Sequence, residues 1–578
     1  MVFMIIRPKL WIIAAVALAI SAVSMIPAAL AANVASVRLR GTPPAAEDLA
    51  EAGATSTLAP SSSMTMRVVM ALRNQSELTQ LLAEQQDPSS PEYHQWLTPE
   101  EFTARFGPTP EGIAQVSAWL TQQGFNVISA DASSRLVRFT GTAAQAATAF
   151  QTSFAATPNG RYHANLVSPA VPANLASLIQ SVEGLNNIRG FGVTPVPEVQ
   201  VTKTKYAFGP EDMWAFYDES PLFPSIDGSG ADCIALPEYA GYDSASVSLF
   251  DNEFGLPAPD ITTVAVDGGG DASPSAETET LIDIEYSHTA APETPIQLYV
   301  AGAADSNPET AFLDPLQQAV TDNACGSISL SIFVCPGEDS ALANDAEAIY
   351  EQAATQGQTV FAAAGDDGAA EEIVNAKNNC VAGKKRGVIE TAAAPYVVSV
   401  GGTEIVKPKY DKSDEGIVVP GSGTEEVWHE GIGAGGGGAS QVFSKPAYQN
   451  GVTPADNARD IPDISLLAAT KTPGYVFAQN DELYFGGGGT SFASPYWAGI
   501  AALIEQLEGG RLGGSFAFNT RLYSLASSNA AANGIRDVTK GINSFHGVKG
   551  FKAEPGYDQA TGWGTPDILL FVQAYTGP

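Results

Sequence analysis

The sequence predicts an α/β fold, in which a mostly parallel sheet covered by helices follows a smaller α+β unit. Three observations predict it. The chain has 578 residues, enough for about two or three domains. From residue 206 onward, apolar strands alternate with Ala-rich helices, a pattern typical of a parallel sheet covered on both faces. Residues 64–187 mix helical and strand spacing in one short unit.

The N-terminus, residues 1–31, has the pattern of a secretory signal peptide. Arg7 and Lys9 precede an apolar run over 10–26, and Ala29-Leu30-Ala31 is a small-x-small cleavage site. A retained membrane anchor is the alternative. No other apolar run reaches the ~18 residues of a spanning helix. We therefore expect a secreted, extracellular protein without a membrane segment after signal removal.

Residues 32–189 form the predicted smaller unit, which opens with an Ala/Ser/Pro-rich lead. Helical apolar spacing and strand alternation then follow. The helices are expected at 76–86, 110–125 and 143–154, and a strand at 135–141.

Residues 190–205 read as an exposed linker, because prolines and glycine interrupt any periodicity. Proteases cut extended, accessible segments, so this linker is where we expect processing. The larger domain, residues 206–578, has strands expected at 297–303, 327–334, 359–366 and 396–403, and a helix at 346–357.

The charge balance excludes some partners. With 63 acidic and 29 basic residues the net charge is -34, which repels nucleic acid and anionic membranes. The self-repulsion of such an acidic excess falls as carboxylates become protonated. The composition therefore favours a protein that works at acidic pH. The Gly-rich run 433–440 lacks the strand and the Gly-Lys-Ser/Thr of a phosphate loop.

The four cysteines, Cys233, Cys325, Cys335 and Cys380, all follow the signal. Their even number fits one or two disulfides in an oxidising compartment, and no C-x-x-C spacing indicates a metal site. The pairing stays open, and free buried cysteines are the alternative.

Ser491 stands between a glycine run and an apolar helical pattern, a placement that exposes nucleophiles in many hydrolases. Gly489-Thr490-Ser491-x-x-x-Pro495 resembles the serine motif of the subtilisin-like fold. That fold also needs a His-Gly-Thr before the serine, and none of the five histidines supplies one. A different group must take the proton.

Glu279 and Asp283 are a candidate base. Four residues apart, they share one face of a helix, and two such close carboxyls resist joint ionisation. One can then serve as base in acid, where a histidine would be protonated. The alternative is an ordinary solvated helix face. Neighbouring Leu281, Ile282 and Ile284, and the lack of Lys or Arg over 272–297, disfavour it.

Asp366 is the third candidate acid. It directly follows an apolar strand, and the carboxyl ends of parallel strands are where open α/β sheets place their sites. A helix cap or turn aspartate is the alternative.

Taken in order, these motifs resemble the sedolisin family of serine-carboxyl peptidases, with kumamolisin-like features and an N-terminal activation prodomain. The similarity extends over nearly the whole chain after the signal. Segments 93–109, 139–150 and 181–187 resemble the activation prodomain, and 399–405, 461–468 and 556–567 resemble the catalytic domain.

The resemblance implies a subtilisin-like catalytic domain over 206–578 and a ferredoxin-like prodomain over 32–189. It makes Ser491 the nucleophile and Glu279 its base, which Asp283 orients. Asp366 would be protonated and donate a hydrogen bond to the tetrahedral intermediate.

The resemblance also implies one calcium ion per chain. Asp537 and Asp558 would bind through side chains, and Val538, Glu554 and Gly556 through backbone oxygens. Oxygen ligands suit this hard cation. The prodomain would inhibit its own catalytic domain, and we expect a monomer that acts on proteins or peptides.

The chain departs from the family pattern in three places. Asp367 stands where the family has serine, Leu330 replaces a common tryptophan, and a Cys-containing insert follows at 331–339. Subsite shape therefore cannot be copied from the family. We expect a secreted, acid-acting endopeptidase made as an autoactivated zymogen. A tripeptidyl-type exopeptidase and an inactive secreted binding protein are the alternatives.

Overall fold

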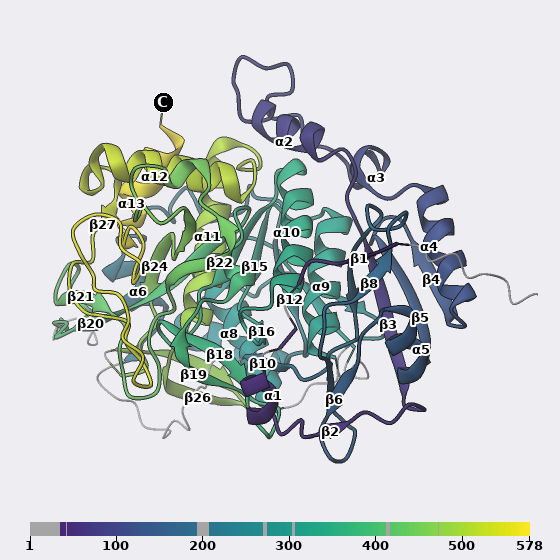
Figure 1. Ribbon diagram of the computed structural model, residues 1–578. Helices are drawn as coiled ribbons and strands as arrows, with labels where there is room; N and C mark the ends of the chain where they lie inside the picture. Colours follow the sequence, from purple (N-terminus) through teal and green to yellow (C-terminus); the bar gives the residue numbers. More distant parts are fainter. Residues whose placement is uncertain are drawn as a thin grey trace, which may run out of the picture.

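The computed structural model has a parallel sheet at the centre of its C-terminal domain (Figure 1). It describes residues 35–41, 43–44, 46–192, 207–269, 274–302, 307–411, 417–471 and 473–577. The strand order is β13-β14-β12-β15-β17-β20-β21, and β24 also pairs with β20. All these pairs are parallel except β20 with β21. The strands are β12 (Ile234–Glu238), β13 (Ile261–Val266), β14 (Ile296–Ala301), β15 (Ser327–Leu330), β17 (Thr359–Ala363), β20 (Val398–Val406), β21 (Thr424–Val427) and β24 (Ile464–Leu467).

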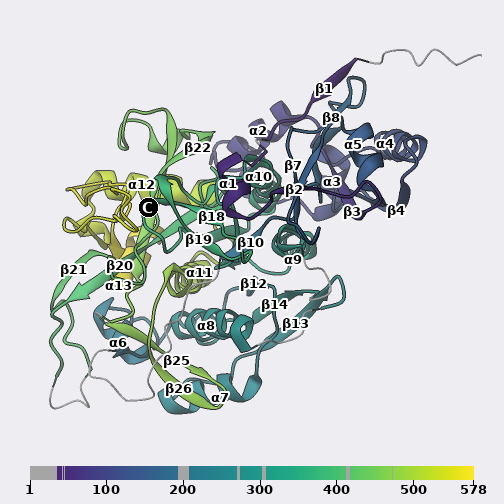
Figure 2. The same cartoon turned by 60° about the horizontal axis from the view of Figure 1, so that its bottom comes forward.

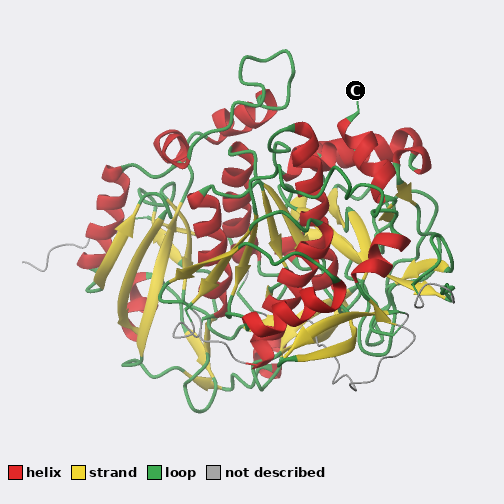
Figure 3. Ribbon diagram, turned by 180° about the vertical axis from the view of Figure 1, so that it is seen from behind, coloured by secondary structure: helices red, strands yellow, loops and turns green. Residues whose placement is uncertain are grey.

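Helices cover both faces of this sheet (Figure 3). Along β12, Ile234 and Leu236 pack with residues of α8 (Pro274–Ala290) and α11 (Thr490–Glu508). Ala235, between them, packs with residues of α9 (Pro308–Asp322) and α10 (Ser340–Thr355). Successive strand side chains point to opposite faces, so a strand buried on both faces reads as a continuous apolar run. The predicted covered α/β sheet is confirmed.

The N-terminal unit is a second, antiparallel sheet with the order β4-β5-β3-β9. Along the chain, β3 (Ser63–Met70), α4 (Pro110–Gln122), β4 (Asn126–Asp131), β5 (Leu136–Thr142), α5 (Ala143–Ala149) and β9 (Ile179–Glu183) make a βαββαβ unit. Met64, Met66 and Val68 of β3 point into its core. This topology is the expected ferredoxin-like one.

Further helices and short strands flank the two sheets. The helices are α1 (Ala46–Glu51), α2 (Gln75–Glu84), α3 (Pro99–Phe106), α6 (Pro210–Phe216), α7 (Ser244–Phe254), α12 (Ser515–Asn529) and α13 (Ile568–Thr576). The strands are β10 (Gly190–Gly192), β16 (Phe333–Cys335), β18 (Ala370–Val374) and β19 (Cys380–Arg386).

The other face of the N-terminal sheet lies against α9 and α10 of the C-terminal domain (Figure 1). Arg67 of β3 forms a buried ion pair with Asp314 of α9, and Arg138 of β5 lies 2.8 Å from the same carboxyl. Ser181 of β9 donates a 2.6 Å hydrogen bond to Asp345 of α10. A basic sheet face thus meets acidic helices.

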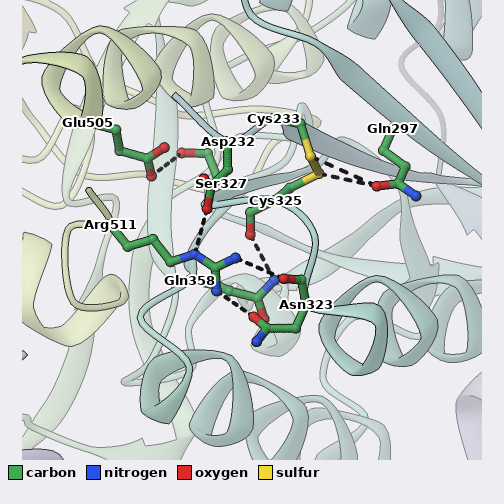
Figure 4. Close-up of a disulfide and its surroundings, with 9 residues drawn as sticks. All are labelled: Asp232, Cys233, Gln297, Asn323, Cys325, Ser327, Gln358, Glu505 and Arg511. Atoms are coloured by element: carbon green, nitrogen blue, oxygen red, sulfur yellow. Dashed lines mark hydrogen bonds and ion pairs between the residues drawn. A yellow bond between two sulfur atoms is a disulfide. The ribbon is translucent and has the colours of Figure 1, made fainter. Parts of the chain in front are cut away.

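All four cysteines are paired, Cys233 with Cys325 and Cys335 with Cys380. The first disulfide joins the residues just before β12 and β15, which are neighbours in the parallel sheet. Figure 4 shows it beside Gln297, whose Oε1 lies 3.7 Å from Sγ of Cys325. It therefore fastens the amino ends of two strands whose carboxyl ends, described below, carry the site.

Several sequence expectations need correction or lie outside the described residues. The strand expected at 327–334 is two strands, β15 and β16, and the helix expected at 143–154 ends at Ala149. The signal and most of the predicted linker, residues 193–205, lie outside the described residues. Over the described ranges, no helix has the length and apolar character needed to cross a bilayer.

Candidate active site

Ser491 lies in the first turn of α11, at the edge where the parallel strands end. Gly489 precedes the helix with a φ of 131°, which favours glycine. Ser491 itself is buried. Its Oγ lies 3.5 Å from the backbone oxygen of Ser331, directly after β15, and the Ser331 hydroxyl oxygen lies 3.2 Å from the backbone oxygen of Ser491.

The predicted carboxyl pair lies on α8, which packs along α11. Glu279 and Asp283 are 2% and 0% exposed, so the alternative of a solvated helix face is wrong. Ser331 donates a 2.7 Å hydrogen bond to Oδ1 of Asp283. Burial, and then the carboxyl of Glu238, raise the pKa of Asp283 well above its usual range. The pair is thus joined to the Ser491 segment through one hydroxyl.

Glu238, at the end of β12, is a member of the site that sequence reasoning missed. It is fully buried, and burial followed by the charge of Glu279 raises its pKa to about 8. Burial and the carboxyls of Glu279, Glu238 and Asp283 also raise the pKa of neighbouring Tyr239. Three carboxyl groups therefore share one buried space. The signal was an acid that ends an apolar strand, the same signal that indicated Asp366.

Asp366 follows β17 and contacts the residue before the serine. Its Oδ1 accepts hydrogen bonds from the backbone nitrogen of Thr490 at 2.8 Å and from the Thr490 hydroxyl at 2.9 Å. The structure thus brings Asp366, which the sequence placed after an apolar strand, to the start of α11.

Asp367 brings a further acid to this edge. It interacts with Glu372 of β18 and with His546, and burial raises its pKa. Burial, and then Asp367, raise the pKa of Glu372 well above its usual range, and Asp366 contributes in the same direction. Asp367, which is half-buried, and Glu372, which is buried, therefore form a carboxyl pair beside Asp366.

These side chains come from the carboxyl ends of β12, β15 and β17, from the middle of α8 and from the first turn of α11. After β12 the chain builds β13 and β14 on one side of it, and β15 and β17 on the other. Open α/β sheets place their sites at such a change of direction. Figure 2 shows α8 and α11 next to each other.

The five histidines have different surroundings, and one of them, His546, interacts with Asp367. His288 is on α8, but its Nε2 lies 2.8 Å from the backbone oxygen of Pro257 and 3.7 Å from Asp251 of α7. His429 and His546 are exposed, and His94 and His163 belong to the N-terminal unit.

The predicted calcium ligands lie on two facing loops near the C-terminus. Asp537 Oδ2 accepts a 2.9 Å hydrogen bond from the amide of Gly556, and Asp558 Oδ2 accepts one of 3.0 Å from the amide of Glu554. Both carboxylates thus accept hydrogen bonds from the backbone of residues 554–556. The donors expected from the sequence, two carboxylates and backbone oxygens, are the oxygen ligands that suit Ca²⁺. Within the described ranges, no cluster of three or more His, Cys, Asp or Glu side chains could hold a metal, and two carboxylates fall below that number.

Comparison with known proteins agrees with the geometry. Residues 51–188 match the family "Pro-kumamolisin, activation domain". Xanthomonalisin of Xanthomonas sp. (strain T-22) is 29% identical over 556 residues, 87% of this chain and 64% of xanthomonalisin. Kumamolisin of Bacillus sp. (strain MN-32) is 30% identical over 452 residues, 72% of this chain and 74% of kumamolisin.

A solved structure supports the fold. Pseudomonas sedolisin, a serine-carboxyl proteinase complexed with two molecules of pseudo-iodotyrostatin, superimposes with a TM-score of 0.55 and 26% identity. The match covers 64% of this chain and 98% of sedolisin. The chain therefore belongs to the sedolisin family and is a serine-type peptidase with an N-terminal activation prodomain.

Proposed function

We propose that this peptidase is secreted as a zymogen and acts in acid as an endopeptidase through Ser491, Glu279, Asp283 and Asp366. The observation that carries the proposal is the set of groups that contact the Ser491 segment. Its segment is joined to Asp283 through Ser331 and to Asp366 through Thr490. These are carboxyl groups, and His288, the histidine on α8, hydrogen-bonds to Pro257 instead.

In this mechanism the Ser491 hydroxyl oxygen attacks the peptide carbonyl carbon while Glu279 takes its proton. Glu279 then gives that proton to the leaving amine as the C–N bond breaks. In the second half Glu279 takes a proton from water as the water oxygen attacks the acyl carbon, and it returns this proton to the Ser491 oxygen as the acyl ester bond breaks. Asp283, held by Ser331, orients Glu279.

Asp366 stabilises the oxyanion of the tetrahedral intermediate. Because both Thr490 donors occupy Oδ1, a proton on this carboxyl belongs on Oδ2, from which it can be donated to the tetrahedral intermediate. A neutral carboxylic acid does there what a backbone amide does in other serine peptidases.

The two roles define a pH window. Glu279 must be ionised to accept a proton while Asp366 must be protonated to donate one. Carboxyl groups titrate near ~4, so activity should centre at roughly pH 3 to 5.

The path of the chain out of the prodomain supports endopeptidase action. β10 pairs antiparallel with β16, so the chain runs toward Ser331 as its numbers rise. A continuous chain that extends away from Ser491 on the amino side fits an open cleft end. A tripeptidyl exopeptidase needs that end closed.

The domain plan of the zymogen follows the sequence. Residues 32–189 are the inhibitory prodomain, 190–205 the linker with the processing bond, and 206–578 the catalytic domain, a monomer. Asp537 and Asp558, with backbone oxygens of Val538, Glu554 and Gly556, would hold one calcium ion, whose positive charge would fasten their two loops together.

Acidification of the purified precursor tests the proposal. The wild type should shorten by cleavage within 190–205 and then degrade a denatured protein in an acid zymogram, while Ser491→Ala should stay full length and inactive. Equal shortening of the two proteins would reject self-processing. Activity of the Ser491→Ala protein, with its mass verified, would reject the nucleophile.

A further inference from the structure

Among the described strands, β16 pairs with β10, the strand that ends the N-terminal unit, and not with a strand of the central sheet. Gly190, Phe191 and Gly192 of β10 pair antiparallel with Cys335, Val334 and Phe333. In the described part of the chain, β10 and β16 form a two-stranded sheet of their own. Removal of the prodomain therefore leaves a strand edge with unpaired backbone groups, which readily accepts another extended chain.

The edge leads to the nucleophile. Phe333 lies two residues after Ser331, whose hydroxyl contacts Ser491 and Asp283. Since Gly190 lies opposite Cys335 and Gly192 opposite Phe333, the paired chain runs from its amino end toward Ser491. A peptide in this position lies on the amino side of the bond that Ser491 attacks.

The side chains around β10 set a pattern of small, aromatic, small. A Cβ on Gly192 would overlap the ring of Phe333. A Cβ on Gly190 would lie 3.0 Å from the backbone oxygen of Asn378. Between them, the ring of Phe191 stacks on Tyr239 with centroids 4.7 Å apart and planes at 14°.

Tyr239 connects this strand with the chemistry. It follows Glu238 directly and lies near the carboxyls of Glu279 and Asp283. An aromatic side chain stacked there reaches the wall of the catalytic site. The residues that contact the small-aromatic-small sequence thus form part of the cleft, several residues away from the reacting bond.

The strand is held by elements of this chain. β16 belongs to the insert after Leu330, and the disulfide Cys335–Cys380 fastens its end to β19. β19 and the preceding turn form the second wall, where the Asn378 side chain donates a hydrogen bond to the backbone oxygen of Arg189. A fixed edge binds an extended peptide without the cost of ordering itself.

We propose that β16, with Tyr239 and Asn378, is a distal substrate-binding site of the mature enzyme. It binds an extended peptide segment on the amino side of the cleaved bond and selects a small-aromatic-small sequence. In the zymogen, residues 190–192 occupy this site. The inference rests on the proposed peptidase function at Ser491.

Peptide substrates of the acid-processed enzyme test this site. A reference peptide that the enzyme cleaves is extended at its amino end with Gly-Phe-Gly, through spacers of zero to three residues. At one spacing kcat/KM should rise roughly 10-fold, mainly through a lower KM, because stacking and strand pairing act in binding. Gly-Ala-Gly should lose most of the gain, and Gly-Phe-Val all of it.

A compensating change identifies the site. Phe333→Ala removes the ring that a Cβ at the Gly192 position would overlap. This variant should therefore accept Gly-Phe-Val at least as well as Gly-Phe-Gly. Phe223→Ala removes a half-buried ring elsewhere, one that packs on Trp214, and should keep the wild-type preference.

The outcomes separate this proposal from the peptidase function. Cleavage of the reference peptide with no gain at any spacing, or equal gains from Gly-Phe-Gly and Gly-Phe-Val, overturns the distal site alone. Failure to cleave any peptide in acid overturns the proposed function and the distal site with it. Should Phe333→Ala not fold, the wild-type peptide series still decides.

Discussion

The hydroxyl of Ser331 lies 2.7 Å from Oδ1 of Asp283 and, through the same oxygen, 3.2 Å from the backbone oxygen of Ser491. One small side chain thus joins the nucleophile segment to the carboxyl pair. Ser331→Ala should lower kcat by roughly 10-fold, the value of one net hydrogen bond, and change KM little, because the hydroxyl does not face substrate. Steady-state kinetics at pH 4 measure both constants.

Ser399→Ala is the matched control for that variant. Ser399 is equally buried, on β20, and within the described residues its hydroxyl has no hydrogen-bond partner. It should keep kcat close to wild type. A Ser331→Ala enzyme with unchanged kcat would contradict the positioning role.

Glu279→Gln preserves shape and removes basicity. We expect turnover to fall at least ~100-fold, the lower range for a lost general base. His288→Ala and His429→Ala should leave the pH profile of kcat nearly unmoved. A wild-type bell centred near pH 8, or loss of activity in either folded histidine variant, would return the enzyme to the Ser-His-Asp class.

Asp367→Ser tests the acid pair beside Asp366. The negative charge shared by Asp367 and Glu372 opposes ionisation of Asp366, so its removal should let Asp366 lose its proton at lower pH. The alkaline limb of kcat/KM should move down by roughly one pH unit. Glu371→Gln, a neighbour on the same strand, should leave the limb in place. An upward shift would contradict this charge coupling.

Asp314→Asn should release the prodomain early. Burial alone would raise the pKa of Asp314, but the guanidinium of Arg67, with help from Arg138, lowers it to about 2. Its unfolded pKa lies near ~4, so this carboxylate stabilises the interface above pH 4 and the contribution fades as pH falls toward 2. At pH 5 the variant precursor should shorten roughly 10-fold faster than wild type, as followed on gels.

Asp322→Asn provides the control for the interface. Asp322 ends the same helix, α9, but is exposed. Its precursor should shorten at the wild-type rate. Equal rates for Asp314→Asn and wild type would show that the ion pairs do not hold the prodomain.

Calcium removal tests the Asp537 and Asp558 loops. A ligand bound only by the native state stabilises it by mass action, so a chelator should lower the melting temperature of the mature enzyme. Asp558→Ala should already melt lower and respond no further. A wild-type melt indifferent to chelator would reject the ion.

Sequence patterns predicted much of this site because each pattern reflects a local constraint. The i, i+4 spacing placed Glu279 and Asp283 on one helix face, and the end of an apolar strand placed Asp366. Glu238 carried the same strand-end signal. It was missed because nothing in the sequence says that β12 lies next to β15.

Other features depend on contacts between distant segments. The run 327–334 has no glycine or proline to mark its break, so β15 and β16 looked like one strand. The approach of Glu372 to Asp367 depends on the turn between β17 and β18. The pairing of Gly190–Gly192 with the insert joins segments more than a hundred residues apart, and no local periodicity records it.

The pairing of β10 with β16 affects when the cut precursor begins to degrade substrates. Cleavage beyond Gly192 would leave the strand attached to the departing prodomain, so the first product carries two attachments to the enzyme, the cleft strand and the Arg67–Asp314 face. Two linked weak contacts hold far more tightly than either alone. The cut prodomain would then act as a bivalent product inhibitor, and chain scission and onset of proteolysis would be separate events.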